Sequence, residues 1–147
     1  MNLNESTIDL IKNTRALYNS REENYKGRLV IGWEHELTQT ELKNGLTYLS
    51  REDSDKLLIK DLKRICTKLN KEHIPNNNLS QQQYNALVSL IYDVGLHSVK
   101  LSGLFELINE GSYTEAGALF RKWNTYLKQR IYKLTKLRKL EIDLFNT

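Results

Sequence analysis

The sequence predicts a mainly α-helical protein with one small β-hairpin, an α+β fold. Two long stretches, 50–74 and 79–124, carry apolar residues at helical spacing. The stretch 28–33 contains adjacent β-branched residues between glycines, and therefore predicts a short strand in a hairpin or small sheet. With 147 residues, the chain is expected to form a single domain over 1–147 that buries its core without disulfide staples.

The stretch 79–124 is predicted to form three short helices around which the other elements are arranged. Capping boxes are predicted at Ser80 with Gln83 and at Ser112 with Glu115, and helix breaks at 93–95 and at Gly111. The core-facing residues are expected to be Tyr84, Leu87, Val88, Ile91, Tyr92, Leu101, Leu104, Phe105, Ile108, Ala116, Leu119, Phe120 and Trp123. Because the connections are short, these helices must pack on one another.

Three further helices are predicted outside this stretch. The first covers 6–17, capped by Ser6 or Thr7, and is followed by a polar segment at 18–27. The second begins at a capping box formed by Ser50 and Asp53 and ends before Pro75 and the asparagines at 76–78, whereas 37–49 is ambiguous. The third is a basic helix that continues from Asn124 and ends with a structural segment at 138–145.

Charge is unevenly distributed along a chain whose net charge is only +4. Eight lysines and arginines lie within 121–139 without an acidic residue among them. This run predicts either a solvated helical face or a surface that attracts a polyanion, such as an envelope polymer or a nucleic acid. The single cysteine, Cys66, is expected to be a small buried hydrophobic residue.

The first twenty residues contain neither the apolar core of a signal peptide nor a membrane span. We therefore expect a protein made in the cytoplasm, which acts there, in a virion, or at the cell wall after release by a holin or a secretion machine. The three histidines show no metal-ligand spacing, so we expect no metal or other cofactor. We also expect a monomer.

Two segments of the predicted helical region carry a family resemblance. LSQQQYNALVSLIYDVG and LINEGSYTEAGALFRKWN closely resemble the C-terminal lobe of the phage-type lysozymes, glycoside hydrolase family 24. The resemblance implies a two-lobed fold with an N-terminal helix and β-hairpin lobe at 1–50, a connecting helix at 50–74 and a helical lobe at 79–147. It also implies a cleft between the lobes that binds the glycan strands of peptidoglycan.

The family resemblance includes a catalytic motif, E-x8-D-x5-T-I-G-x-G-H, whose glutamic acid acts as proton donor. Ile31, Gly32 and His35 anchor this sequence on the motif without a gap. In that register the three catalytic positions and the glycine before the histidine hold other residues: Arg15, Asn24, Val30 and Glu34, respectively.

These replacements remove the groups that glycoside cleavage requires. Arginine stays protonated and cannot act as a general acid, asparagine lacks the charge of aspartate, and valine lacks the hydroxyl of threonine. Arg15, Asn24, Val30, Trp33 and His35 are nevertheless expected to lie at the cleft, with His35 in a structural role. Whether Arg15 pairs with a neighbour such as Glu141 is left open.

Three functions follow from these observations. The first is a catalytically degenerate lysozyme-like protein that holds peptidoglycan, or a protein partner of a phage-derived assembly, in the old glycan cleft. The second is an active muramidase in which Glu22, Glu23 or Glu34 supplies the missing carboxylates. The third is a polyanion-binding protein that uses the basic run at 121–139.

Overall fold

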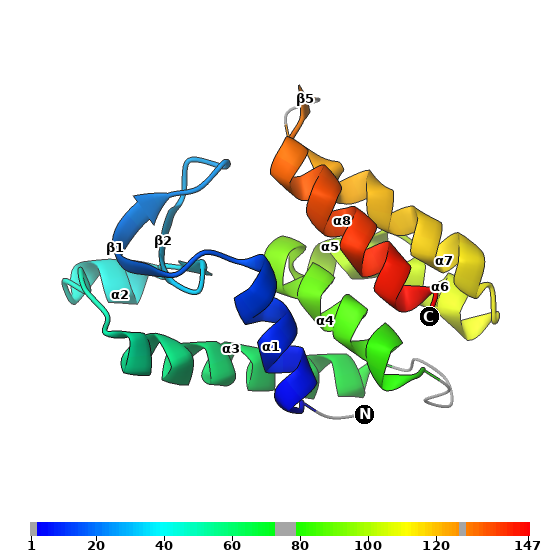
Figure 1. Cartoon of the computed structure of the whole chain (residues 1–147), viewed down its shortest axis with the longest axis horizontal. Helices are drawn as coiled ribbons and strands as arrows, with labels where there is room; N and C mark the ends of the chain where they lie inside the picture. The colour runs from blue at the N-terminus through cyan, green and yellow to red at the C-terminus, as the bar shows by residue number, and fades with distance from the viewer. Residues whose placement is uncertain (1–2, 73–78, 127–128) are drawn as a thin grey trace.

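The computed structural model describes residues 3–72, 79–126 and 129–147. Figure 1 shows a small sheet at one end, a group of helices at the other, and one long helix, α3, running beneath both. In chain order the elements are α1 (Glu5–Thr14), β1 (Tyr18–Glu23), β2 (Leu29–Gly32), β3 (His35–Glu36), α2 (Gln39–Lys43), α3 (Arg51–Lys71), α4 (Gln81–Val94), α5 (Leu96–Leu101), α6 (Leu104–Asn109), α7 (Tyr113–Leu119), the 3-10 helix η2 (Phe120–Asn124), β4 (Thr125–Tyr126), β5 (Gln129–Arg130) and α8 (Tyr132–Phe145).

The first helix begins and ends earlier than the sequence predicts. Its cap is Asn4, whose Oδ1 accepts a hydrogen bond from the Thr7 backbone N–H at 3.2 Å, so the expected caps Ser6 and Thr7 lie inside the helix. Asparagine is at least as good a cap as serine, and the Ser6 hydroxyl instead donates to Asn4 at 2.6 Å. The helix ends at Thr14 because Arg15 is extended, with φ −119° and ψ 157°.

The strand predicted at 28–33 is confirmed as β2, the central strand of an antiparallel sheet in the order β1-β2-β3. β1 lies within the segment that the sequence marked only as polar. β3 lies just before the ambiguous segment 37–49, and α2 lies within it. β1 and β2 pair with an irregularity between Tyr18 and Glu22. Gly32, with φ 65°, adopts the left-handed conformation that favours glycine, and its close neighbour is Ser54 of α3.

Of the three predicted capping boxes, one forms in full, one forms only its serine cap, and one does not form. Ser50 accepts from the Asp53 N–H at 3.0 Å, and Ser80 and Gln83 form the reciprocal capping box at the start of α4. Gly95, with φ 86°, ends α4 at the predicted break. Ser112 makes no side-chain cap because its ψ of 60° departs from the extended backbone that an N-cap needs. α3 ends at Lys71, before Pro75 as predicted, and residues 73–78 lie outside the described part of the chain.

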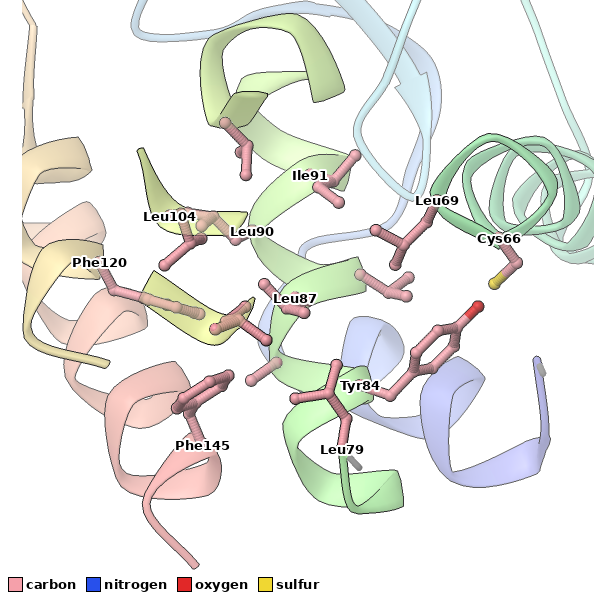
Figure 2. Close-up of a cluster of buried hydrophobic side chains, with 14 of the residues drawn as sticks. Cys66, Leu69, Leu79, Tyr84, Leu87, Leu90, Ile91, Leu104, Phe120 and Phe145 are labelled. Atoms are coloured by element: carbon pink, nitrogen blue, oxygen red, sulfur yellow. The ribbon is translucent and has the colours of Figure 1, made fainter. Parts of the chain in front are cut away.

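The core is built on α4, whose apolar face meets helices on both sides (Figure 2). Leu87 and Leu90 are fully buried, and the rings of Phe120 and Phe145 lie 5.4 Å apart between η2 and α8. Cys66 is buried, as predicted, and burial raises the pKa of its thiol. The described residues contain no helix long and apolar enough to cross a membrane.

The chain after Asn124 does not continue directly as the predicted basic helix. The 3-10 helix η2 ends there, and the short strands β4 and β5 pair antiparallel before α8 begins. Trp123 leaves helical geometry, with φ −99° and ψ 36°, which turns the chain toward β4. α8 then packs back against α4 and η2 (Figure 1).

Candidate functional site

A cleft of about 550 Å³ lies between the sheet and the helices α4 and α8, with α3 contributing to its lining. The predicted site residues that line it are Arg15, Glu23, Asn24, Val30, Glu34 and His35. Glu22 and Trp33 are not among its described lining residues. The register on the motif therefore brings the three replaced positions to one cleft.

Arg15 reaches this cleft from the end of α1, but its guanidinium group is turned into the protein. The side chain is buried. Nη1 donates to the Thr14 hydroxyl at 2.8 Å and to the Ser89 hydroxyl at 2.9 Å, and Nη2 donates to the Ser89 carbonyl at 2.8 Å. Its guanidinium carbon also lies 5.5 Å from the centre of the Tyr92 ring. Arg15 thus fastens the end of α1 to the middle of α4.

The same contacts connect Arg15 to a buried charge cluster. The Ser89 hydroxyl donates to Glu141 of α8 at 2.5 Å, and Glu141 in turn pairs with Arg138. Arg138 also pairs with Asp93 of α4 and donates to the Trp123 carbonyl. Burial raises the pKa of Glu141, while the charges of Arg138 and Arg15 oppose this effect. Arg15 reaches Glu141 through Ser89, which answers the question left open by the sequence.

Asn24 and Val30 have mainly structural surroundings. The Asn24 Oδ1 accepts from the Lys26 and Arg28 backbone N–H groups, at 2.9 and 3.0 Å, and so closes the β1–β2 turn. Val30 is buried in β2, where it pairs with Glu36. Neither residue carries a charge or a hydroxyl that could act on a glycosidic bond.

Glu34 lines the site in an unusual backbone conformation. It is the one described non-glycine residue with positive φ, 63°, at a cost of order 1–3 kcal/mol. Its Oε1 accepts a long, 3.5 Å hydrogen bond from the Ala16 N–H, directly beside Arg15. The same oxygen lies 2.6 Å from Lys133 Nζ of α8.

The structure adds three acidic residues to the cleft that the sequence did not single out: Glu36, Asp61 and Asp93. Glu36 pairs with Arg28 at 3.2 Å and with Lys26 at 3.8 Å. In the described part of the chain, the Asp61 Oδ1 is the one buried side-chain oxygen without a hydrogen bond, although the Arg64 guanidinium lies 3.5 Å away. Glu23, in contrast, is exposed at the hairpin. The sequence motif did not mark these residues, and the fold brings them to the cleft.

His35 links the sheet to two helices. Its Nδ1 lies 2.6 Å from Asp61 of α3 and its Nε2 lies 2.8 Å from Glu41 of α2. Burial alone would lower the pKa of His35, but the hydrogen bonds and charges of Asp61 and Glu41 outweigh it and raise the pKa above its ordinary value. Both ring nitrogens are engaged, as expected of a structural histidine.

Trp33, which the sequence assigned to the cleft, points into the core. It is buried, and its indole N–H donates to Asp55 of α3 at 2.8 Å. The residue lies in the turn between β2 and β3, and its ring belongs to the buried core cluster. Within the described ranges, no group of three histidine, cysteine or acidic side chains is arranged to hold a metal ion.

The basic run at 121–139 is not one solvated face. Arg138 is buried in the charge cluster, while Arg121, Lys122, Arg130, Lys133, Lys136 and Lys139 are exposed. Lys128 lies outside the described residues. Because these cations are exposed, they could contact a polyanion, and polyanion binding stays a prediction.

Comparison with known proteins places these features in context. The profile of the family described as Phage lysozyme matches residues 13–141. The chain is 31% identical, over its whole length, to the endolysin of Bacillus phage B103, and spans 55% of that relative. It is 29% identical over 125 residues to the endolysin of Acyrthosiphon pisum secondary endosymbiont phage 1, covering 84% of this chain and 81% of the relative. The chain thus spans about half the length of the first of these curated relatives.

Solved structures of phage lysozymes and of a muramidase domain share the fold of this chain. The muramidase domain of SpmX from Asticaccaulis excentricus superposes with a TM-score of 0.81 at 27% identity, covering 99% of this chain and 98% of that domain. An endolysin from the Escherichia coli phage FAHEc1 superposes with a TM-score of 0.77 at 21% identity, covering 99% and 93%. The α+β fold is therefore that of the phage lysozymes.

Replacing Arg15 by methionine should lower the free energy of unfolding by about 2–4 kcal/mol, because Ser89 and Glu141 lose a buried cationic partner. Urea denaturation measures this change. Lys63→Met, at an exposed position of α3, is the matched control and should shift stability by less than about 0.5 kcal/mol. Equal losses in the two variants would contradict the role of Arg15 as an internal fastener.

The raised pKa of His35 predicts a stability that depends on pH. The folded state holds the proton more tightly, so this contribution is complete below about pH 6.5 and is lost as pH rises through the folded pKa. The free energy of unfolding should therefore fall as pH rises from about 6.5 through the raised folded pKa of His35. His35→Gln should flatten this dependence, and His97→Gln, at an exposed position, should leave it intact.

Proposed function

The chain belongs to the phage lysozyme family, and we propose that it binds the glycan strands of bacterial peptidoglycan without hydrolysing them. The cleft has a volume within the range of ligand sites, about 300–1,000 Å³, and combines apolar side chains with charged ones. In this proposal the family scaffold keeps its cleft and loses the chemistry that the motif implies.

The observation that carries this proposal is the state of Arg15. A glycosidase needs a neutral carboxyl group that protonates the leaving oxygen. The motif position of that acid holds a guanidinium group that cannot give up its proton at accessible pH. Its three hydrogen bonds to Thr14 and Ser89 also keep it directed away from a ligand.

The remaining acidic residues of the cleft support the same proposal. Four of the five described carboxylates that line it are ion-paired: Glu34, Glu36, Asp61 and Asp93. The fifth, Glu23, is exposed to water. A general acid must face the leaving oxygen, whereas four of these carboxylates are engaged with cations of the protein.

Purified peptidoglycan sacculi provide a direct test. The protein should pellet with sacculi while releasing no reducing sugar, whereas an active endolysin releases it under the same conditions. Lys68→Trp places a ring in the cleft and should weaken binding at least about tenfold. Lys63→Trp, on the same helix but outside the cleft lining, should bind normally. Rapid sugar release by the wild type would contradict the proposal, and a protein that does not pellet would point to a protein partner instead.

A second candidate function is a muramidase that uses Glu34 as a relocated carboxylate. The observation that favours it is the position of Glu34 beside Ala16, next to the motif position of the missing acid. In that case Glu34→Gln should reduce sugar release by at least about a hundredfold, in line with the loss of a general acid or base. Glu22→Gln, outside the cleft lining, should have no effect, and Glu23→Gln tests the remaining carboxylate. Unchanged release in all three variants would exclude this mechanism.

A further inference from the structure

One ion pair connects the two walls of the cleft. Glu34 belongs to the turn between β2 and β3, Lys133 belongs to the first turn of α8, and the two residues are 99 positions apart. Figure 1 shows the sheet and the beginning of α8 facing each other. We propose that the Glu34–Lys133 pair is a latch that holds the cleft closed, and that a glycan strand must break it to enter. This inference rests on the proposed binding function.

The latch lies beside residues of the catalytic motif. The Glu34 oxygen that faces Lys133 also accepts from the Ala16 N–H, at the junction between α1 and β1. Both latch residues line the cleft together with Arg15. A ligand that occupies the motif positions therefore lies against the ion pair and has to replace at least one of its partners.

The backbone of Glu34 orients the latch. A φ of 63° is uncommon for a residue other than glycine, and such conformations cluster at ligand clamps and switch regions. The motif has glycine at this position, where no side chain could reach across the cleft. Here the carboxylate is directed toward α8, so the substitution supplies the very group that closes the cleft.

A second contact crosses the cleft at the tip of the hairpin. The ring of Tyr25 lies edge-on to that of Tyr126, with 5.7 Å between their centres. Lys26 Nζ donates to the Asp93 carbonyl at 3.4 Å, and the Tyr25 hydroxyl donates to the Asp93 carboxylate at 3.5 Å. These hydrogen bonds are long, which is consistent with a closure that can be reversed.

The exposure of the pair sets the strength of the latch. The side chains of Glu34 and Lys133 are 21% and 58% exposed, so water competes for both charges. Pairs of this kind shift an equilibrium by about two- to fivefold. A latch of that strength keeps the cleft closed most of the time but yields to a ligand.

Charge reversal tests the latch without a ligand. Lys133→Glu and Glu34→Lys each replace attraction by repulsion, and the double variant restores an opposite-charge pair. Lys136→Glu, at an exposed position on the same helix and outside the cleft lining, is the matched control. Spin labels at Glu22→Cys and Lys139→Cys, in a Cys66→Ala background, report the distance between the sheet and α8.

Both single reversals should lengthen and broaden the distribution of distances between the two spin labels. The double variant and the Lys136→Glu control should both give the distribution of the parent. Each single reversal should also bind glycan strands about two- to fivefold more tightly than wild type. Parent-like distances in both single reversals would overturn the latch and leave the binding proposal standing. If the single reversals change the label distances but no variant pellets with sacculi, the result would support the latch and contradict the binding proposal.

Discussion

The buried charge cluster formed by Arg15, Asp93, Arg138 and Glu141 is the constraint on which the arrangement of the helices depends. Its four formal charges cancel, and its members come from the end of α1, from α4 and from α8. Because an unpaired buried charge is costly, movement of one helix would leave another with an uncompensated group. The cluster therefore fixes three helices relative to one another, and the cleft forms where this fixed group meets the sheet.

This constraint bears directly on chemistry. A proton donor in a glycosidase must face the ligand and exchange its proton, whereas a residue that neutralises Glu141 must face inward and stay charged. Arg15 meets the second requirement with hydrogen bonds to Ser89 on one side and a ring contact with Tyr92 on the other. One position cannot meet both requirements, so Arg15 cannot be the proton donor of the motif.

Two ion pairs of α8 differ in their burial. Arg138, inside the cluster, is 1% exposed, whereas Lys133, five residues earlier in the same helix, is 58% exposed in its pair with Glu34. Buried pairs resist rearrangement because separation leaves their charges without water. Exposed pairs exchange with water at little cost. The buried cluster therefore holds α1, α4 and α8 together, whereas the Glu34–Lys133 pair can exchange with water.

The sequence by itself determined the elements that local interactions specify. The capping box at Ser80, the break at Gly95 and the strand β2 follow from contacts within a few residues, and the family motif brought Arg15, Asn24 and Val30 to one cleft. Only the tertiary structure decided that Arg15 is buried, that Trp33 turns into the core and that a hairpin precedes α8. These outcomes depend on distant partners, such as Ser89, which lies 74 positions from Arg15. Local periodicity cannot encode such partners, because it records which face of an element is apolar and not which element will cover it.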